Sequence, residues 1–296
     1  MKFMNFNFHS FLRYLHSQTD VSLDLKHITI NIMKHKTTLW AIGLAAIIGA
    51  QTYNASAQPQ PLQAGVQSGP SIDNYFTPST ADAMKPDDQG FIRRWLLLDP
   101  ISKPNRSNTV FTDSYLREAF AKEYFPNQLT VLPKAGSKIK VMVEKQPPVN
   151  LQAGRPMMPP PEQKPIIEKA TLEWHAFDSK LFNVKLFRLA TGLNKDRYGV
   201  LFWAVTVINC DEDMNVRLAV GSNSASMWWL DGKEVLLLSG DRRMVVDDCV
   251  SPIISLKKGK NILRGAVING PGMSDFCVRF LDLDGKPVTN YTITNK

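Results

Sequence analysis

Any hydrolytic chemistry in this sequence would depend on His175, the only one of its five histidines beyond residue 35. A serine triad places an imidazole between a hydroxyl and a carboxylate. The candidate nucleophiles are Ser222, Ser239 and Ser274. The Gly-x-Ser-x-Gly pattern of a nucleophile elbow is absent. A structural histidine beside Trp174 explains the same residue more simply, so we expect no catalytic site here.

Sugar binding is the second chemistry that the residue types allow. Trp228 and Trp229 are neighbours in a strand-like run, and successive side chains of a strand point to opposite faces. One ring should therefore enter the core. The other either faces solvent, where it could stack on a sugar ring, or is covered by a neighbouring segment.

Polar candidates for the same ligand lie in the turns. Asp241, Arg242 and Arg243 follow Ser-Gly in a loop, and guanidinium and carboxylate groups suit sugar hydroxyls or uronic acids. Salt bridges that fix the loop would use the same residues. Asn269 begins a tight Asn-Gly-Pro-Gly turn, where it either caps the backbone or faces ligand. Asp231 completes the set of candidate ligand-binding residues.

Metal binding has weaker support. His175 is the only histidine after the signal, which excludes the usual zinc sites, whereas calcium needs only oxygen ligands. The weak candidates are Asp211, Asp213, Asp247 and Asp248, whose spacing matches no known calcium loop. Solvated turn acids explain them equally well. We expect no cofactor, and a structural calcium ion stays open.

The elements that must position these residues are mainly strands. Strand patterns cover 198–209, 216–220, 227–230, 233–238, 253–256, 262–268, 276–281 and 288–293. The first of these runs is apolar throughout, as expected for a strand buried on both faces. Asp231-Gly232 between two apolar runs predicts a tight hairpin. Two further hairpins are predicted at 253–268 and 276–293.

Upstream of these strands, 91–98 and 138–144 are predicted strands, and 113–125 has the apolar spacing of a helix that Pro126 ends. The sequence therefore predicts a mainly β protein: an antiparallel β-sandwich of the jelly-roll type with one or two short helices.

The N-terminal region has the pattern of an export signal. Residues 33–57 contain a basic start, an apolar run and an Ala-Ser-Ala cleavage pattern. Translation is therefore expected to begin at Met33, with 1–32 a mis-annotated start. Residues 58–89 are expected to form a flexible spacer, and 90–296 a β-sandwich domain with a Pro-rich loop at 146–165. The location would be secreted or periplasmic, with no membrane span after signal removal.

The charge distribution limits the expected partners, and the cysteines limit the possible disulfides. The net charge is +8, but the basic residues follow no stripe, so nucleic acid is not an expected partner. Cys210, Cys249 and Cys277 lie in an exported chain. They could form one disulfide in any of three pairings, or none.

Several stretches resemble galactose-binding-like jelly rolls. They are Gly221-Ser-Asn-Ser-Ala-Ser-Met-Trp-Trp-Leu-Asp-Gly-Lys-Glu-Val235, Leu256-Lys-Lys-Gly-Lys-Asn-Ile-Leu263 and Arg279-Phe-Leu-Asp-Leu-Asp-Gly-Lys-Pro287. With Phe91-Ile-Arg-Arg-Trp95, Trp174-His175, Phe202-Trp-Ala204, Asp241-Arg-Arg-Met244 and Asn269-Gly-Pro-Gly272, the longer pattern is similar to a module of secreted Bacteroidota proteins. Some relatives in that group are named acetylxylan esterases.

The resemblance implies a secreted accessory module that binds or presents glycan in polysaccharide utilisation. Its partners would be a polysaccharide or oligosaccharide, and another secreted or surface glycan-degrading protein. Two alternatives stay open: a carbohydrate esterase acting on acetylated xylan, and a structural module for protein–protein interaction. Jelly rolls host all three kinds of function.

The first prediction concerns processing. N-terminal sequencing of the mature protein should give a chain that starts close to Gln58, because cleavage follows the small residues of the signal. A mature chain that retains any of residues 1–32 would contradict both the expected start at Met33 and the signal.

Overall fold

The computed structural model describes residues 71–104, 110–145, 166–270 and 272–296. In chain order the elements are η1 (Ile72–Asn74), β1 (Phe76–Pro78), β2 (Arg94–Leu98), β3 (Ile101–Ser102), α4 (Asp113–Ala121), β4 (Lys138–Lys145), β5 (Ile166–Ser179), α5 (Leu186–Gly192), β6 (Val200–Cys210), β7 (Met214–Ser222), β8 (Ala225–Leu230), β9 (Lys233–Leu238), β10 (Cys249–Val250), β11 (Ile254–Leu256), β12 (Gly259–Asn269), β13 (Phe276–Leu281) and β14 (Tyr291–Thr294). The signal, the first part of the spacer and the Pro-rich loop lie outside the described residues.

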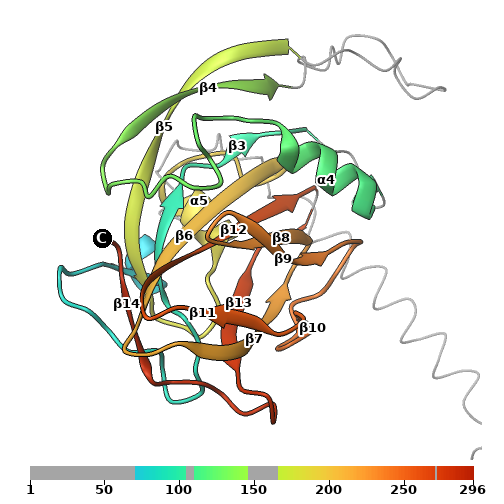
Figure 1. Cartoon of the computed structure of the whole chain (residues 1–296). Helices are drawn as coiled ribbons and strands as arrows, with labels where there is room; N and C mark the ends of the chain where they lie inside the picture. Colours follow the sequence, from blue (N-terminus) through green and yellow to red (C-terminus); the bar gives the residue numbers. More distant parts are fainter. Residues whose placement is uncertain (1–70, 105–109, 146–165, 271) are drawn as a thin grey trace, which may run out of the picture. The chain divides into compact units, whose positions relative to one another are not determined.

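Two antiparallel sheets form the fold, which confirms the predicted β-sandwich. The large sheet has ten strands and runs β1-β5-β2-β6-β12-β8-β9, with β4 paired to β5 and with β3 and β14 paired to β6. In the small sheet, β10, β11 and β13 all pair with β7. Figure 1 shows the small sheet on one side of the large sheet and α4 on the other.

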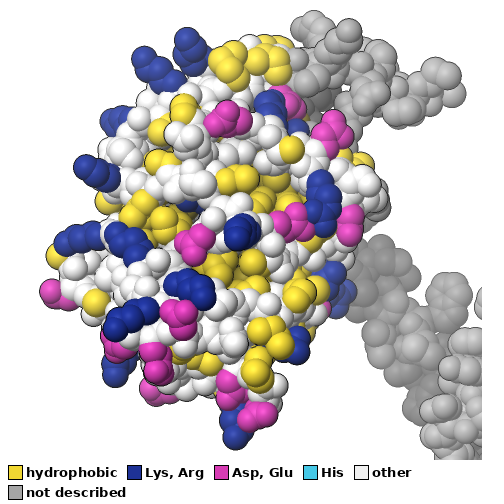
Figure 2. All heavy atoms as spheres, in the orientation of Figure 1, with side chains coloured by type: hydrophobic (Ala, Val, Ile, Leu, Met, Phe, Trp, Pro, Cys, Tyr) yellow, Lys and Arg dark blue, Asp and Glu magenta, His cyan; other side chains and the backbone are white. Residues whose placement is uncertain are grey.

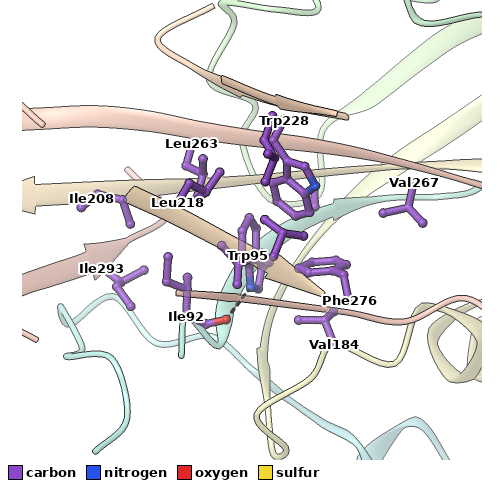
Figure 3. Packing of buried hydrophobic residues seen from close by; sticks show 14 of the residues in the cluster. Ile92, Trp95, Val184, Ile208, Leu218, Trp228, Leu263, Val267, Phe276 and Ile293 are labelled. Atoms are coloured by element: carbon purple, nitrogen blue, oxygen red, sulfur yellow. Dashed lines mark hydrogen bonds between the residues drawn. The ribbon is translucent and has the colours of Figure 1, made fainter. Parts of the chain in front are cut away.

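The first core fills the space between the two sheets. Alternate residues of β7 and β13 meet Trp95, Trp228 and Leu263 of the large sheet. Figure 3 shows how the rings pack: Phe276 lies edge-on to Trp95 at 5.0 Å between centroids and close to Trp228 at 5.2 Å. The buried indole N–H of Trp95 donates to the carbonyl of Ile92 at 2.9 Å. This core therefore combines dense aromatic packing with a satisfied polar group.

The second core covers the opposite face of the large sheet. Trp203 and Trp229 stack on each other with centroids 5.5 Å apart, and Phe120 of α4 packs edge-on against both rings. Helix α4 begins at its N-cap Thr112, whose hydroxyl accepts from the Tyr115 N–H. β6 is buried along nearly its whole length because both of its faces are covered, as its apolar sequence predicted.

Three sequence predictions about topology are wrong. β11 pairs with β7 while β12 pairs with β6 and β8, so 253–268 is not a hairpin. Likewise β13 pairs with β7 and β14 with β6, so 276–293 is not a hairpin either. In both cases the short connection crosses from one sheet to the other. Finally, 71–89 is not spacer: β1 pairs with β5 and Phe76 is buried in the first core.

The prediction of one or two short helices is confirmed by α4 and α5, but the sequence located only α4. Its three buried residues, Leu186, Leu189 and Ala190, have helical spacing, but the run is only seven residues long. Elsewhere β4 and β5 pair, with Lys145 opposite Ile166 on either side of the Pro-rich stretch. No helix in the described part of the chain is long and apolar enough to cross a membrane.

The second prediction concerns the Asp231-Gly232 turn, where the sequence prediction is confirmed. Both residues have positive φ, 48° and 79°. Asp231 also donates its N–H to Ile262, and its side chain accepts from the Ile262 N–H. Asp231→Pro should lower the free energy of unfolding by about 3 kcal/mol or more, because proline fixes φ near −65° and removes the donor. Urea denaturation measures the loss.

Asp231→Asn is the matched control for this change, because asparagine tolerates the left-handed region and keeps an acceptor. Its midpoint should stay near that of the wild type. Equal midpoints for the proline variant and the wild type would show that the turn does not hold β8 against β9.

Candidate functional site

The two tryptophans expected to divide between core and ligand both belong to the interior. Trp228 is 0% exposed and Trp229 is 4% exposed. They do point to opposite faces of β8, but the sheet is covered on both sides, so each ring enters a different core. The possibility that one ring stacks on a sugar at the surface is therefore wrong.

Of the two arginines in the loop, Arg242 has a structural role and Arg243 does not. Arg242 donates to Asp248 Oδ2 from two guanidinium nitrogens, at 2.8 and 2.6 Å, and to the Ser239 carbonyl. This is the loop-fixing salt bridge that the sequence left open. Asp241 and Arg243 are exposed. Arg243 makes no hydrogen bond or ion pair within the described ranges.

Three of the four acids expected as weak metal ligands contact cationic side chains instead. Asp213 accepts from the Lys257 side chain and the Lys258 N–H. Asp247 pairs with Arg279, and Asp248 with Arg242. Among the described residues, Asp211 included, no three His, Cys, Asp or Glu side chains are grouped to hold a metal ion.

The cysteines are free thiols in the structure. Burial is the main reason that the pKa of Cys210 rises to about 11 and that of Cys277 to about 12. Both therefore remain protonated and unreactive at neutral pH.

His175 takes part in a buried polar cluster and not in a serine triad. Its Nε2 lies 3.0 Å from Asp99 Oδ1, while Lys195 Nζ lies 3.0 Å from Asp99 Oδ2. The Asp99 side chain is only 3% exposed. No hydrogen bond joins His175 to Ser222, Ser239 or Ser274 in the described part of the chain. The cluster ties β5 and the loop after α5 to one buried carboxylate.

The surface group best suited to a ligand surrounds α5, and it was not among the predicted residues. It consists of Tyr75, Phe187, Arg188, Arg197 and Tyr198, and we call it the aromatic–arginine platform. The rings of Phe187 and Tyr198 meet edge to face at 5.5 Å. Tyr198 is 52% exposed, which makes it one of the most exposed large side chains described.

Each guanidinium of the platform lies over two rings. Arg188 is 5.5 Å from the centroid of Tyr75 and 5.9 Å from that of Phe187. Arg197 is 5.6 Å from Phe187 and 5.7 Å from Tyr198. Neither arginine has a hydrogen bond or ion pair within the described residues, so their donor groups are open to a ligand.

Contacts on the buried side of α5 hold the platform in position. Leu186, Leu189 and Ala190 anchor α5 in the first core and leave Phe187 and Arg188 on the outer side of the helix. The Phe187 N–H donates to the Ser274 carbonyl at 2.9 Å.

The loop that carries Arg197 and Tyr198 is held at two points. Lys195 pairs with Asp99 at 3.0 Å, and the Asn269 amide donates to the Arg197 carbonyl at 3.1 Å. Asn269 is fully buried, so of its two expected roles it performs the backbone cap. It acts on the site by positioning.

Sequence alone gives only a faint signal for the platform. Phe187-Arg188 and Arg197-Tyr198 are aromatic–arginine pairs ten residues apart. Nothing in that spacing says that the loop folds back so that Arg197 reaches Phe187. The contact depends on the buried anchors Asp99 and Asn269, which lie far away along the chain.

Comparison with known proteins gives few matches. No family model matches the chain, and no curated protein matches it in sequence. A PA14 sugar-binding domain from an RTX adhesin is 6% identical with a TM-score of 0.36, over 68% of this chain and 96% of that domain.

A β-glucosidase from Kluyveromyces marxianus is 16% identical with a TM-score of 0.25, over 36% of this chain. The match spans 14% of the β-glucosidase. At these TM-scores neither similarity assigns a fold or a function to this chain. The resemblance to secreted Bacteroidota modules and acetylxylan esterases stays a prediction, because no matched protein bears on it.

The third prediction uses the pH dependence of the Asp99 cluster. Burial raises the pKa of the Asp99 carboxyl, but hydrogen bonds from His175, Lys195 and the Glu173 N–H lower it, and the net pKa lies below its ordinary value of 3.8. A lowered folded-state pKa stabilises the protein above the unfolded-state pKa, and this stability is lost as pH falls through the folded-state value.

Asp99→Asn should therefore lower the free energy of unfolding by about 1–3 kcal/mol at pH 6. The difference from wild type should shrink as the pH falls below 3.8 toward the lowered folded-state pKa of the Asp99 carboxyl, where the wild-type side chain becomes protonated. Urea denaturation midpoints of both proteins, measured from pH 6 downward, give this difference in stability. A difference that is the same at every pH would show that the Asp99 charge contributes nothing.

Proposed function

We propose that this chain is a secreted accessory module that binds glycan, and that the aromatic–arginine platform is its binding surface. The observation that carries the proposal is the pair of guanidinium groups that lie over the exposed Tyr198 ring and the half-buried Phe187 and Tyr75 rings. Arg188 and Arg197 flank the contact between Phe187 and Tyr198. Export is part of the proposal and rests on the signal pattern at 33–57.

The rings supply the apolar half of the recognition. An aromatic face carries partial negative charge, and the C–H groups on one side of a sugar ring carry partial positive charge. Tyr198 presents such a face together with a hydroxyl at its edge. The edge-to-face contact with Phe187 and the stacking of Arg197 hold the Tyr198 ring in place, so little side-chain entropy is lost when a ligand binds.

The guanidinium groups supply the polar half. A guanidinium offers a planar fork of donors that matches a carboxylate. Two of them beside one aromatic pair favour a glycan with acidic substituents, such as uronic acids, over a neutral one. The same residues have no general base among their contacts, so the platform is better suited to binding than to hydrolysis.

The fourth prediction tests the platform by substitution. Tyr198→Ala and Arg197→Ala should each weaken binding to glucuronic-acid-substituted xylan by about tenfold, equal to the loss of about 1.4 kcal/mol of contact energy. Both residues are exposed, so thermal denaturation should be nearly unchanged. Affinity electrophoresis and titration calorimetry measure the binding.

Arg243→Ala is the matched control, because Arg243 is also an exposed, unpaired arginine but lies outside the platform. It should bind like the wild type. Unsubstituted xylan distinguishes the aromatic contacts from the guanidinium contacts, because it has no carboxylate. Tyr198→Ala should weaken binding to unsubstituted xylan as well, whereas Arg197→Ala should have little effect on it. A wild-type chain that retains none of the tested glycans would favour the interaction-module alternative instead.

A further inference from the structure

A hollow lies beside β5, and its lining includes none of the platform residues. It has a volume of about 520 Å³, which falls within the range of small-molecule sites. Four separate stretches line it: 79–81, 132–135, the middle of β5 at Ala176, and 295–296. Each of these stretches belongs to the described residues, and none contributes to the aromatic–arginine platform.

Small side chains keep the hollow open. Ala176 lies on the face of β5 that the second core covers elsewhere, beside Leu132. The covering segment leaves the sheet at Gly136, which has a positive φ of 75° and donates its N–H to the Trp174 carbonyl. Ala81 and Ala135 complete the wall. A larger side chain in this lining would reduce the space for a ligand.

The floor of the hollow is apolar, and the Lys134 side chain lies at its rim. Leu132 and Pro133 join the three alanines, and the acidic side chains of the described residues are absent from the lining. Lys134 and Lys296 are both exposed at the edge. Lys134 has no ion pair within the described ranges. Figure 2 shows one face of the molecule, where hydrophobic side chains lie between Lys and Arg and between Asp and Glu side chains.

One wall carries a polar group without a partner. Neither the amide oxygen nor the amide nitrogen of Asn295 has a hydrogen-bond partner, and both atoms are buried. A buried polar atom without a partner costs about 1–3 kcal/mol. A small rotation of this side chain toward the hollow would let a bound molecule satisfy it.

We propose that this hollow binds a small amphiphilic carboxylate. The apolar body of the molecule would lie against Leu132, Pro133 and Ala176, which removes apolar surface from water. Its carboxylate would lie beside the Lys134 ammonium, with the Asn295 amide as a further donor. A glycan suits this hollow poorly because its hydroxyls would face an apolar floor, so the two sites take different ligand classes.

The test uses the full chain with two matched probes, 4-phenylbutyrate and its neutral analogue 4-phenylbutanol. Calorimetry should show binding of both to the wild type, with the carboxylate bound more tightly. Lys134→Ala should weaken binding of 4-phenylbutyrate by about tenfold and leave that of 4-phenylbutanol unchanged, because only the carboxylate pairs with the ammonium. Ala135→Trp should abolish binding of both probes by filling the space.

Lys140→Ala is the control, since Lys140 is an exposed lysine of β4 outside the lining. It should bind both probes like the wild type. Three outcomes would overturn the proposal: neither probe binds the wild type, Ala135→Trp binds as the wild type does, or Lys134→Ala weakens both probes equally. Binding of the two probes is independent of glycan binding, so the Tyr198→Ala variant should bind both probes like the wild type.

Discussion

Burial of the large sheet on both of its faces is the constraint on which the rest of the structure depends. Trp228 and Gly265 show it most directly. They are opposite each other on β8 and β12, and a Cβ on Gly265 would lie 2.4 Å from the Trp228 ring. The ring occupies that space and meets Trp95 and Phe276 of the first core. A side chain at Gly265 would displace the ring, and with it the packing between the sheets.

The same constraint decides which aromatic residues are available for binding. Trp203 and Trp229 face the second core, which α4 and the segment after it cover. All four tryptophans of the central strands are therefore used for packing. The exposed Tyr198 ring and the half-buried Phe187 ring lie at the periphery, where α5 and its loop place them. The ligand surface lies beside the sandwich sheets, at the edge of the first core.

Positioning of the platform in turn depends on a few buried polar groups. Asp99 receives Lys195 from the loop and His175 from β5, and Asn269 caps the Arg197 carbonyl. Each of these groups is itself held by a strand or a strand end. The residues that fix the site thus lie in the rigid part of the fold, while the residues that would contact a ligand lie on a helix and a loop.

The sequence by itself determined most of the strands, the α4 helix, the Asp231-Gly232 turn and the double burial of β6. These follow from local rules: side-chain alternation, helical spacing, and the positive φ that the turn requires. Only the tertiary structure decided strand pairing and the site. The Lys257-Lys258 connection could close a hairpin or cross between sheets, and both choices have the same local pattern. Likewise, Trp229 alternates as a surface residue would, and only the distant α4 covers it. Arg197 meets Phe187 because Asp99 and Asn269 hold the loop, and contacts between residues so far apart in the chain leave no local pattern to detect.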